Sequence, residues 1–142
     1  MGTMSTREWR AFLLAGTRTG KIATVSKNGR PTVVPVWFDL DGDELVFETD
    51  EDSAKARNID ANSNVAVCVD DEHFPFAFVS IHGRARVQRL APAELLSWTT
   101  RLPRRYVGDD RADEYGRRNA LEGAVLVRVR VDRVLATKDI AA

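Results

Sequence analysis

The sequence has little of what disulfide-linked, secreted or membrane proteins need. It contains one cysteine, Cys68, among 142 residues, so no disulfide can form within the chain, as is usual in a reducing cytoplasm. No apolar run approaches the ~20 residues of a membrane-spanning helix, and the N-terminus lacks the apolar core of a signal peptide. We therefore expect a cytoplasmic protein without a membrane partner.

An excess of charge of one sign is also missing. Lys plus Arg and Asp plus Glu number 21 each, which gives a formal net charge of zero. Nucleic-acid-binding proteins usually carry a basic surplus, so the balance weighs against a nucleic-acid partner and favours self-association. The length and a hydrophobic content of 44% fit a single domain over residues 1–142.

Residues for metal binding or nucleophilic catalysis are scarce as well. His73 and His82, the only histidines, lie on different expected elements, and no spacing of Cys, His and carboxylates matches a ligand set. A Gly-x-Ser-x-Gly motif is absent, and Ser53 is separated from Lys55 by one residue rather than two. We therefore expect no metal, and the motifs identify no catalytic side chain.

Turn signals and alternating apolar residues predict a mainly antiparallel β-fold. Asn28-Gly29 and Asp41-Gly42 indicate hairpin turns, and Gly83 in the alternating segment 76–89 indicates a bend or bulge. Short turns and one-sided apolar faces favour a closed or partly closed barrel. The six expected strands cover residues 21–25, 31–38, 44–49, 65–70, 76–89 and 124–135.

Capping signals predict the helices between these strands. Ser5 and Glu8 have the spacing of a capping box, and Pro92 suits a first helical turn. The expected helices cover about residues 6–15, 53–61, 92–101 and 112–118.

A polar cluster, Ser53-x-Lys55-x-Arg57-Asn58, stands at the expected start of the second of these helices. A helix N-terminus presents free N–H groups and partial positive charge, and these side chains add donors for an anion. No glycine-rich phosphate loop is present. The cluster can hold a phosphate, or it can be the solvated face of an ordinary amphipathic helix.

Pro35 interrupts the expected strand 31–38 at a place where a central strand would use an N–H donor. An edge strand, a bulge or a backbone that faces a ligand would each explain it. A flat heterocycle could lie against this backbone, while Trp37 and Phe38 could equally be core residues.

Several segments together resemble the flavin and deazaflavin oxidoreductases of the pyridoxamine 5′-phosphate oxidase-like superfamily, over about residues 7–140. The segments are Gly20-Lys21-Ile22-Ala23-Thr24-Val25, Gly29-Arg30-Pro31, Pro35-Val36-Trp37-Phe38 and the polar cluster at 53–58. The segments 105–108, 114–119 and 126–129 are similar to the branch that uses coenzyme F-420.

The resemblance implies a six-stranded antiparallel split β-barrel with peripheral helices and the activity of a deazaflavin-dependent oxidoreductase. Such an enzyme passes a hydride from reduced coenzyme F-420 to a small organic substrate. It also implies a homodimer with two cofactor sites at the interface. An FMN oxidase or reductase of the same fold, or a cofactor-binding protein without turnover, is the alternative. Vitamin B6 oxidation is not expected, because the Arg/His-rich segments for pyridoxal phosphate are missing.

The resemblance also implies which residues meet the cofactor. The ring rests on the strand that includes Val34, the phosphate lies at the polar cluster, and residues 74–78 reach the site of the partner subunit. The expected binding residues are Val34, Pro35, Val36, Trp37, Thr49, Ser53, Lys55, Arg57, Asn58, Phe74 and Phe76. Residues that approach the site from the C-terminal helices, unless the arginines form a solvated face, are Arg104, Arg105, Tyr106, Arg117 and Arg118. Tyr106 and His82 are candidate proton donors.

Overall fold

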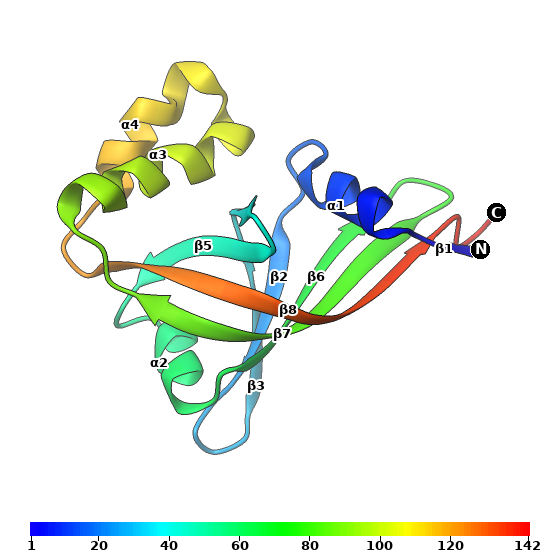
Figure 1. Cartoon of the computed structure of the whole chain (residues 1–142), viewed down its shortest axis with the longest axis horizontal. Helices are drawn as coiled ribbons and strands as arrows, with labels where there is room; N and C mark the ends of the chain where they lie inside the picture. The colour runs from blue at the N-terminus through cyan, green and yellow to red at the C-terminus, as the bar shows by residue number, and fades with distance from the viewer.

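An antiparallel sheet that curls around its own core dominates the structure, a computed structural model that describes residues 1–142 (Figure 1). The strands are β1 (Gly2–Thr3), β2 (Gly20–Val25), β3 (Pro31–Val36), β4 (Phe38–Asp41), β5 (Glu44–Asp50), β6 (Asn64–Asp71), β7 (Ala77–Gln88) and β8 (Ala124–Lys138). The helices are α1 (Thr6–Leu14), α2 (Ala54–Ala61), α3 (Pro92–Val107) and α4 (Asp109–Asn119). None of them combines the length and the hydropathy needed to cross a bilayer.

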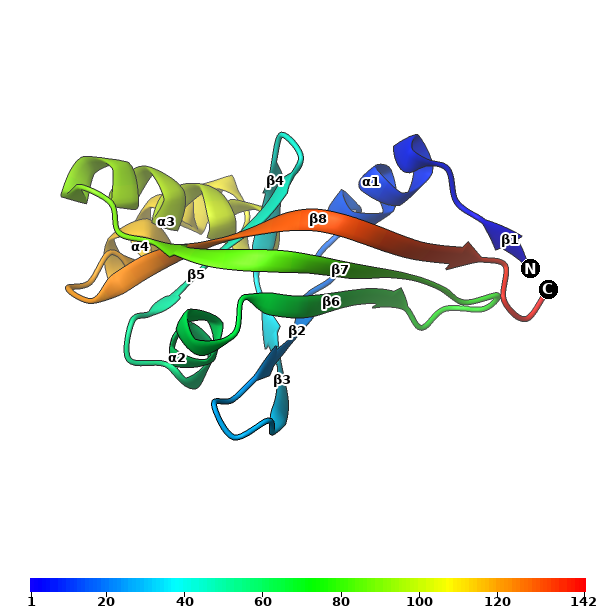
Figure 2. The same ribbon diagram turned by 60° about the horizontal axis from the view of Figure 1, so that its bottom comes forward.

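The strand expected over residues 31–38 is broken at Trp37, which corrects the sequence prediction. β3 pairs with β2, and β4 pairs with β5, at opposite ends of the order β3-β2-β6-β7-β8-β5-β4. The chain therefore passes from one edge of the sheet to the other within one residue, and this closes the barrel on one side. Figure 2 shows β3 and β4 one after the other, crossing behind β6, β7 and β8.

The broken strand and the short β1, which pairs with β8, give eight strands where six were expected. Every other expected strand is present with slightly different ends. The predicted class, a mainly β antiparallel split barrel with peripheral helices, is confirmed.

The main core fills the inside of the curl. Alternate residues of β7, Val79 and Ile81 among them, point into it and are fully buried, as the alternating pattern predicts. On β8, Leu126 breaks the alternation because it is buried on the outer face, under Trp98 and Leu102 of α3. α3 therefore covers the outer face of β5 and β8, and a second, smaller core forms there.

Gly83 lies at a β-bulge, as predicted. In the pairing of β7 with β8, His82 faces Arg133 but Gly83 faces Val131, so β8 carries one extra residue. A Cβ at Gly83 would lie 2.2 Å from the carbonyl oxygen of Arg130. Only glycine fits this close approach of two strands.

The helix starts follow their capping signals, but α3 runs longer than expected. Glu8 N donates to Ser5 Oγ, and Ser5 N donates to Glu8 Oε1, which forms the predicted capping box. α3 continues past Pro103 to Val107, although a proline inside a helix removes one hydrogen bond. Its packing on β5 and β8, together with contact to α4, outweighs that loss.

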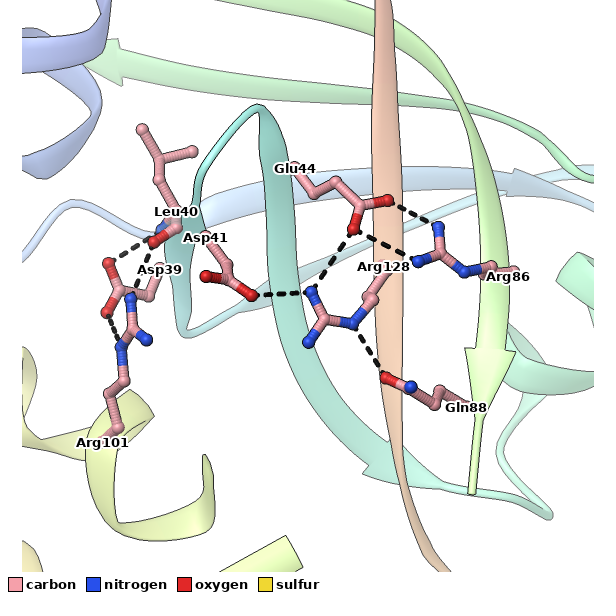
Figure 3. A network of polar contacts seen from close by, with 8 residues as sticks. All are labelled: Asp39, Leu40, Asp41, Glu44, Arg86, Gln88, Arg101 and Arg128. Carbon is pink, nitrogen blue, oxygen red and sulfur yellow. Dashed lines mark hydrogen bonds and ion pairs between the residues drawn. The ribbon is translucent and has the colours of Figure 1, made fainter. Parts of the chain in front are cut away.

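A polar network on the outer face ties the hairpin of β4 and β5 to β7 and β8 (Figure 3). Arg128 donates to Asp41 at 2.8 Å, to Glu44 at 3.3 Å and to Gln88 at 2.8 Å. Arg86 donates to the same glutamate through two nitrogens, and this lowers the pKa of Glu44. The network fixes the turn between β4 and β5, at the end of β4 away from Trp37.

We expect Gly83→Ala to lower the free energy of unfolding by about 2–3 kcal/mol, because the added methyl group would push the β8 backbone away. Gly2→Ala is the matched control in a strand, since its Cβ would meet nothing nearer than a side-chain carbon of Lys138 at 3.7 Å. Urea unfolding of both variants measures the difference. Equal stabilities would contradict the tight bulge.

Candidate functional site

A cleft of about 440 Å³ opens beside the break between β3 and β4. The β3–β4 junction and the end of β5 form one side of it, and the first turn of α2 and the pair of helices α3 and α4 complete it. This volume lies within the usual range for small-molecule sites. The lining residues are Thr19, Pro35, Val36, Trp37, Glu48, Thr49, Asp50, Lys55, Thr99, Leu102, Pro103 and Asn119.

Several of the residues predicted from the sequence meet in this cleft. Pro35, Val36 and Trp37 come from the expected ring-binding strand, and Thr49 and Lys55 come from the expected phosphate site. They reach one place because β5 leads directly into α2, while the β3–β4 junction closes the barrel beside it.

Lys55 is the cation of the cleft, and it has no hydrogen-bond or ion-pair partner in the protein. The other members of the polar cluster are engaged locally. Ser53 caps α2, accepting from Ala56 N at 3.2 Å and from the Thr49 hydroxyl at 3.0 Å. Arg57 is exposed and donates to the carbonyl of Asp52 at 2.6 Å. The positive charge available to an anion in the cleft is therefore that of Lys55, and the carboxylates of Glu48 and Asp50 lie in the same lining.

Asn58 is buried on the side of α2 that faces the sheet. Its Nδ2 donates to the Thr24 hydroxyl at 3.0 Å and lies 3.5 Å from the Thr32 hydroxyl. These bonds tie α2 to β2 and β3, and none of the three residues lines the cleft. In this structure the amide of Asn58 is committed to the protein itself.

Trp37 stands at the chain break with its ring held between the C-terminal helices and the cleft. It stacks on Tyr106 of α3, with ring centroids 5.0 Å apart and planes at 5°, and Tyr115 of α4 lies 6.0 Å away at 47°. About 37% of Trp37 stays exposed. Phe38, which could have lined a ligand, is fully buried in the core instead.

Tyr106 and Arg105 fasten α3 to the barrel. The Tyr106 hydroxyl accepts from Phe38 N at 3.2 Å and donates to the carbonyl of Arg18 at 3.0 Å. Arg105 donates to the carbonyls of Leu13 and Arg18, both at 3.2 Å. Burial raises the pKa of the Tyr106 phenol. The structure therefore places Tyr106 and Arg105 beside the cleft in a structural role.

His82 and the other predicted arginines line no part of the cleft; these arginines are Arg104, Arg117 and Arg118. Arg104 pairs with Asp109 at 3.4 Å, and Arg118 lies over the Tyr115 ring at 5.2 Å. Arg101 also anchors α3, because it donates to Asp39 at 2.9 Å and to the Leu40 carbonyl at 2.8 Å (Figure 3). His82 is exposed on the outer face of β7 and lines no part of the cleft.

Glu48 is a cleft residue that the sequence did not reveal. Burial raises the pKa of its carboxyl, the positive charge of Lys55 lowers it, and Asp50 raises it again. A charged residue in a strand ordinarily faces solvent, so its sequence position alone gives no warning. Its place in the cleft follows only from the structure, in which α3 buries Val46, two residues earlier on the same face of β5.

Two predicted groups lie outside the cleft of their own chain. Val34 and its neighbour Val33 are exposed on β3, an edge strand. Phe74 and Phe76 are 73% and 41% exposed in the loop between β6 and β7, where their rings pack edge to face. Phe76 also lines a second cavity of about 490 Å³ between α1 and the end of β8.

The curled sheet and its cleft define a split-barrel protein of the pyridoxamine 5′-phosphate oxidase-like superfamily. Residues 5–138 match the family described as pyridoxamine 5′-phosphate oxidase, and the chain belongs to that family.

Individual relatives support this assignment. General stress protein 26 of Bacillus subtilis is 32% identical over 95 residues, which are 66% of this chain and 67% of the relative. The crystal structure of the conserved hypothetical protein Rv2991 of Mycobacterium tuberculosis superposes with a TM-score of 0.81 at 24% identity, covering 98% of this chain and 89% of that one. An F420 reductase superposes with a TM-score of 0.67 at 29% identity, covering 87% of this chain and 94% of that one.

Asn58→Ala is expected to lower the free energy of unfolding of the ligand-free protein by about 1–3 kcal/mol, because it removes a buried hydrogen bond. Asn64→Ala, at an exposed position, should change it by no more than about 0.5 kcal/mol. Thermal and urea unfolding measure both. A side chain whose only role is to bind a cofactor would leave the stability of the ligand-free protein unchanged.

Proposed function

We propose that the protein binds a phosphate-bearing, flavin-like cofactor in the cleft and acts as a coenzyme F-420-dependent oxidoreductase. The observation that carries this proposal is the pairing, in one cleft, of an apolar wall with an unpartnered lysine. Pro35, Val36 and Trp37 supply the wall, and Lys55 supplies the charge. A cofactor with a flat ring and one anionic group needs both.

The chemistry of the donor set fits such a group. Lys55 can donate a charge-assisted hydrogen bond to a phosphate without giving up a protein partner. The Thr49 hydroxyl, which donates to Ser53 here, lies in the same lining. β3 pairs on one side only, so the backbone on its other side is available to a ring. When bound, the reduced cofactor supplies a hydride for a small organic substrate.

The protein's own part in the reaction is to bind, orient and shield. Lys55 fixes the anionic end, and the β3–β4 junction sets the plane in which the ring lies. Thr99, Leu102 and Pro103 of α3 wall off the other side of the cleft from water. Holding the reacting groups in a fixed geometry is the main contribution that such a site makes to the rate.

The choice of coenzyme F-420 is supported by the 29% identity with an F420 reductase over 87% of the chain. FMN carries a phosphate and a similar ring, so it is the alternative cofactor. A cofactor-binding role without turnover is the second candidate function. It is favoured by the Tyr106 hydroxyl, which is committed to Phe38 and Arg18 and so is not free to donate a proton to a substrate.

The proposed working unit is a homodimer with the cofactor at the interface. Val33 is 65% exposed on an edge strand, and Phe74 is 73% exposed in a distant loop. Because Phe74 and Phe76 do not line the cleft of their own chain, their proposed contact with a cofactor requires a second copy.

Lys55→Ala is expected to weaken cofactor binding by about 1.5–3 kcal/mol, or roughly 10- to 150-fold, because a hydrogen bond to a charged group is lost. Lys27→Ala, at an exposed hairpin turn, is the control and should bind as the wild type does. Both variants are titrated with coenzyme F-420 and with FMN. An unchanged affinity of the Lys55 variant for both cofactors would remove Lys55 from the site.

A further inference from the structure

Glu48 is a carboxylate of the cleft that forms no ion pair within 4 Å with any protein group. It follows Val46 on the face of β5 that α3 covers, and it lines the cleft beside Leu102. Its carboxylate accepts no hydrogen bond, and the only influences on its pKa are burial and two charges. Glu44, on the same face of the same strand, is bound by Arg86 and Arg128 instead.

The charged groups that face Glu48 are few. Lys55 approaches from the first turn of α2, and Asp50 follows two residues later on β5. α3 and α4 present only uncharged side chains to the cleft, among them Thr99 and Asn119. The residue paired with Glu48 on β8 is the buried Leu126. Lys55 is therefore the group whose charge favours the ionised form of Glu48.

We propose that Glu48 takes up a proton when an anionic ligand binds against Lys55, so that the cleft binds its ligand together with a proton. Where the ligand is the cofactor, this inference rests on the proposed function. A phosphate next to Lys55 cancels the positive charge that favours the carboxylate. It also adds a negative charge to the cleft, and both changes favour the neutral carboxyl.

The direction of the pH dependence follows from this linkage. The pKa of Glu48, already raised by burial, rises further in the complex. Binding is strongest below the pKa of the free protein, weakens as the pH rises between the free and bound pKa values, and stays weaker above both. Glu48 thereby makes the cleft discriminate between ligands by their negative charge.

Calorimetric titration of the full-length protein with coenzyme F-420, in two buffers of different ionisation enthalpy at each of several pH values from the carboxyl range up to neutrality, measures the proton uptake. The ring hydroxyl of this cofactor also titrates near neutrality, so the difference in uptake between the wild type and Glu48→Gln, rather than the absolute uptake, reports on Glu48. The wild type should take up more protons per site than Glu48→Gln, by a fraction of a proton. Above the pKa of Glu48 in the free protein, Glu48→Gln should also bind more tightly than the wild type, by about tenfold for each pKa unit by which the ligand raises the pKa of Glu48.

Glu122→Gln is the matched control, because Glu122 is exposed and lines no part of the cleft. It should take up as much as the wild type. Equal uptake by the wild type and the Glu48 variant at every pH would overturn the inference.

A second measurement separates this inference from the proposed function. The pKa of the Glu48 carboxyl is followed by ¹³C NMR in sulfate and in chloride at equal ionic strength. A higher pKa in sulfate, lost in Lys55→Ala, supports the coupling even if neither coenzyme F-420 nor FMN binds, in which case the proposed function alone fails. An identical pKa in both salts overturns the coupling.

Discussion

The cleft depends on the break between β3 and β4 at Trp37, and the hydrogen bond from Phe38 N to the Tyr106 hydroxyl stabilises this break. β3 and β4 belong to opposite edges of the sheet, yet Trp37 alone joins them. At such a break the backbone leaves the regular ladder, and a buried N–H needs another partner. Tyr106 provides that partner, stacks on Trp37, and brings α3 against the mouth of the barrel.

Because α3 is held against the barrel, the two sides of the cleft come from distant parts of the sequence, the β3–β4 junction and α3. Arg101 and Arg105 add further hydrogen bonds from α3 to the barrel. The Thr99 hydroxyl donates to the Gly116 carbonyl at 2.8 Å and holds α4 against α3. The cleft therefore depends on the helices as much as on the barrel. Lys55 and Glu48 lie in it opposite the apolar residues Leu102 and Pro103 of α3.

Features of the fold that depend on neighbouring residues were predicted well from the sequence. Features that depend on contacts between distant segments were missed. The capping box at Ser5 depends on a residue three positions away, and the bulge at Gly83 requires a glycine. Both could therefore be predicted from the sequence. The break at Trp37 comes from barrel closure, and residues on both sides of it suit a strand. Lys55 was found from the helix start, whereas Glu48 could not be found without knowing that α3 packs on the same face of β5.

The central claim is that a flavin-like cofactor places its ring on the β3–β4 junction and its anionic end at Lys55. Backbone amide NMR during titration with coenzyme F-420, and in parallel with FMN, tests this most directly. The account predicts that the largest shift changes fall on Val36, Trp37 and the first turn of α2. Changes centred on Phe12 and Phe76, which line the second cavity, with none at Lys55, would contradict it.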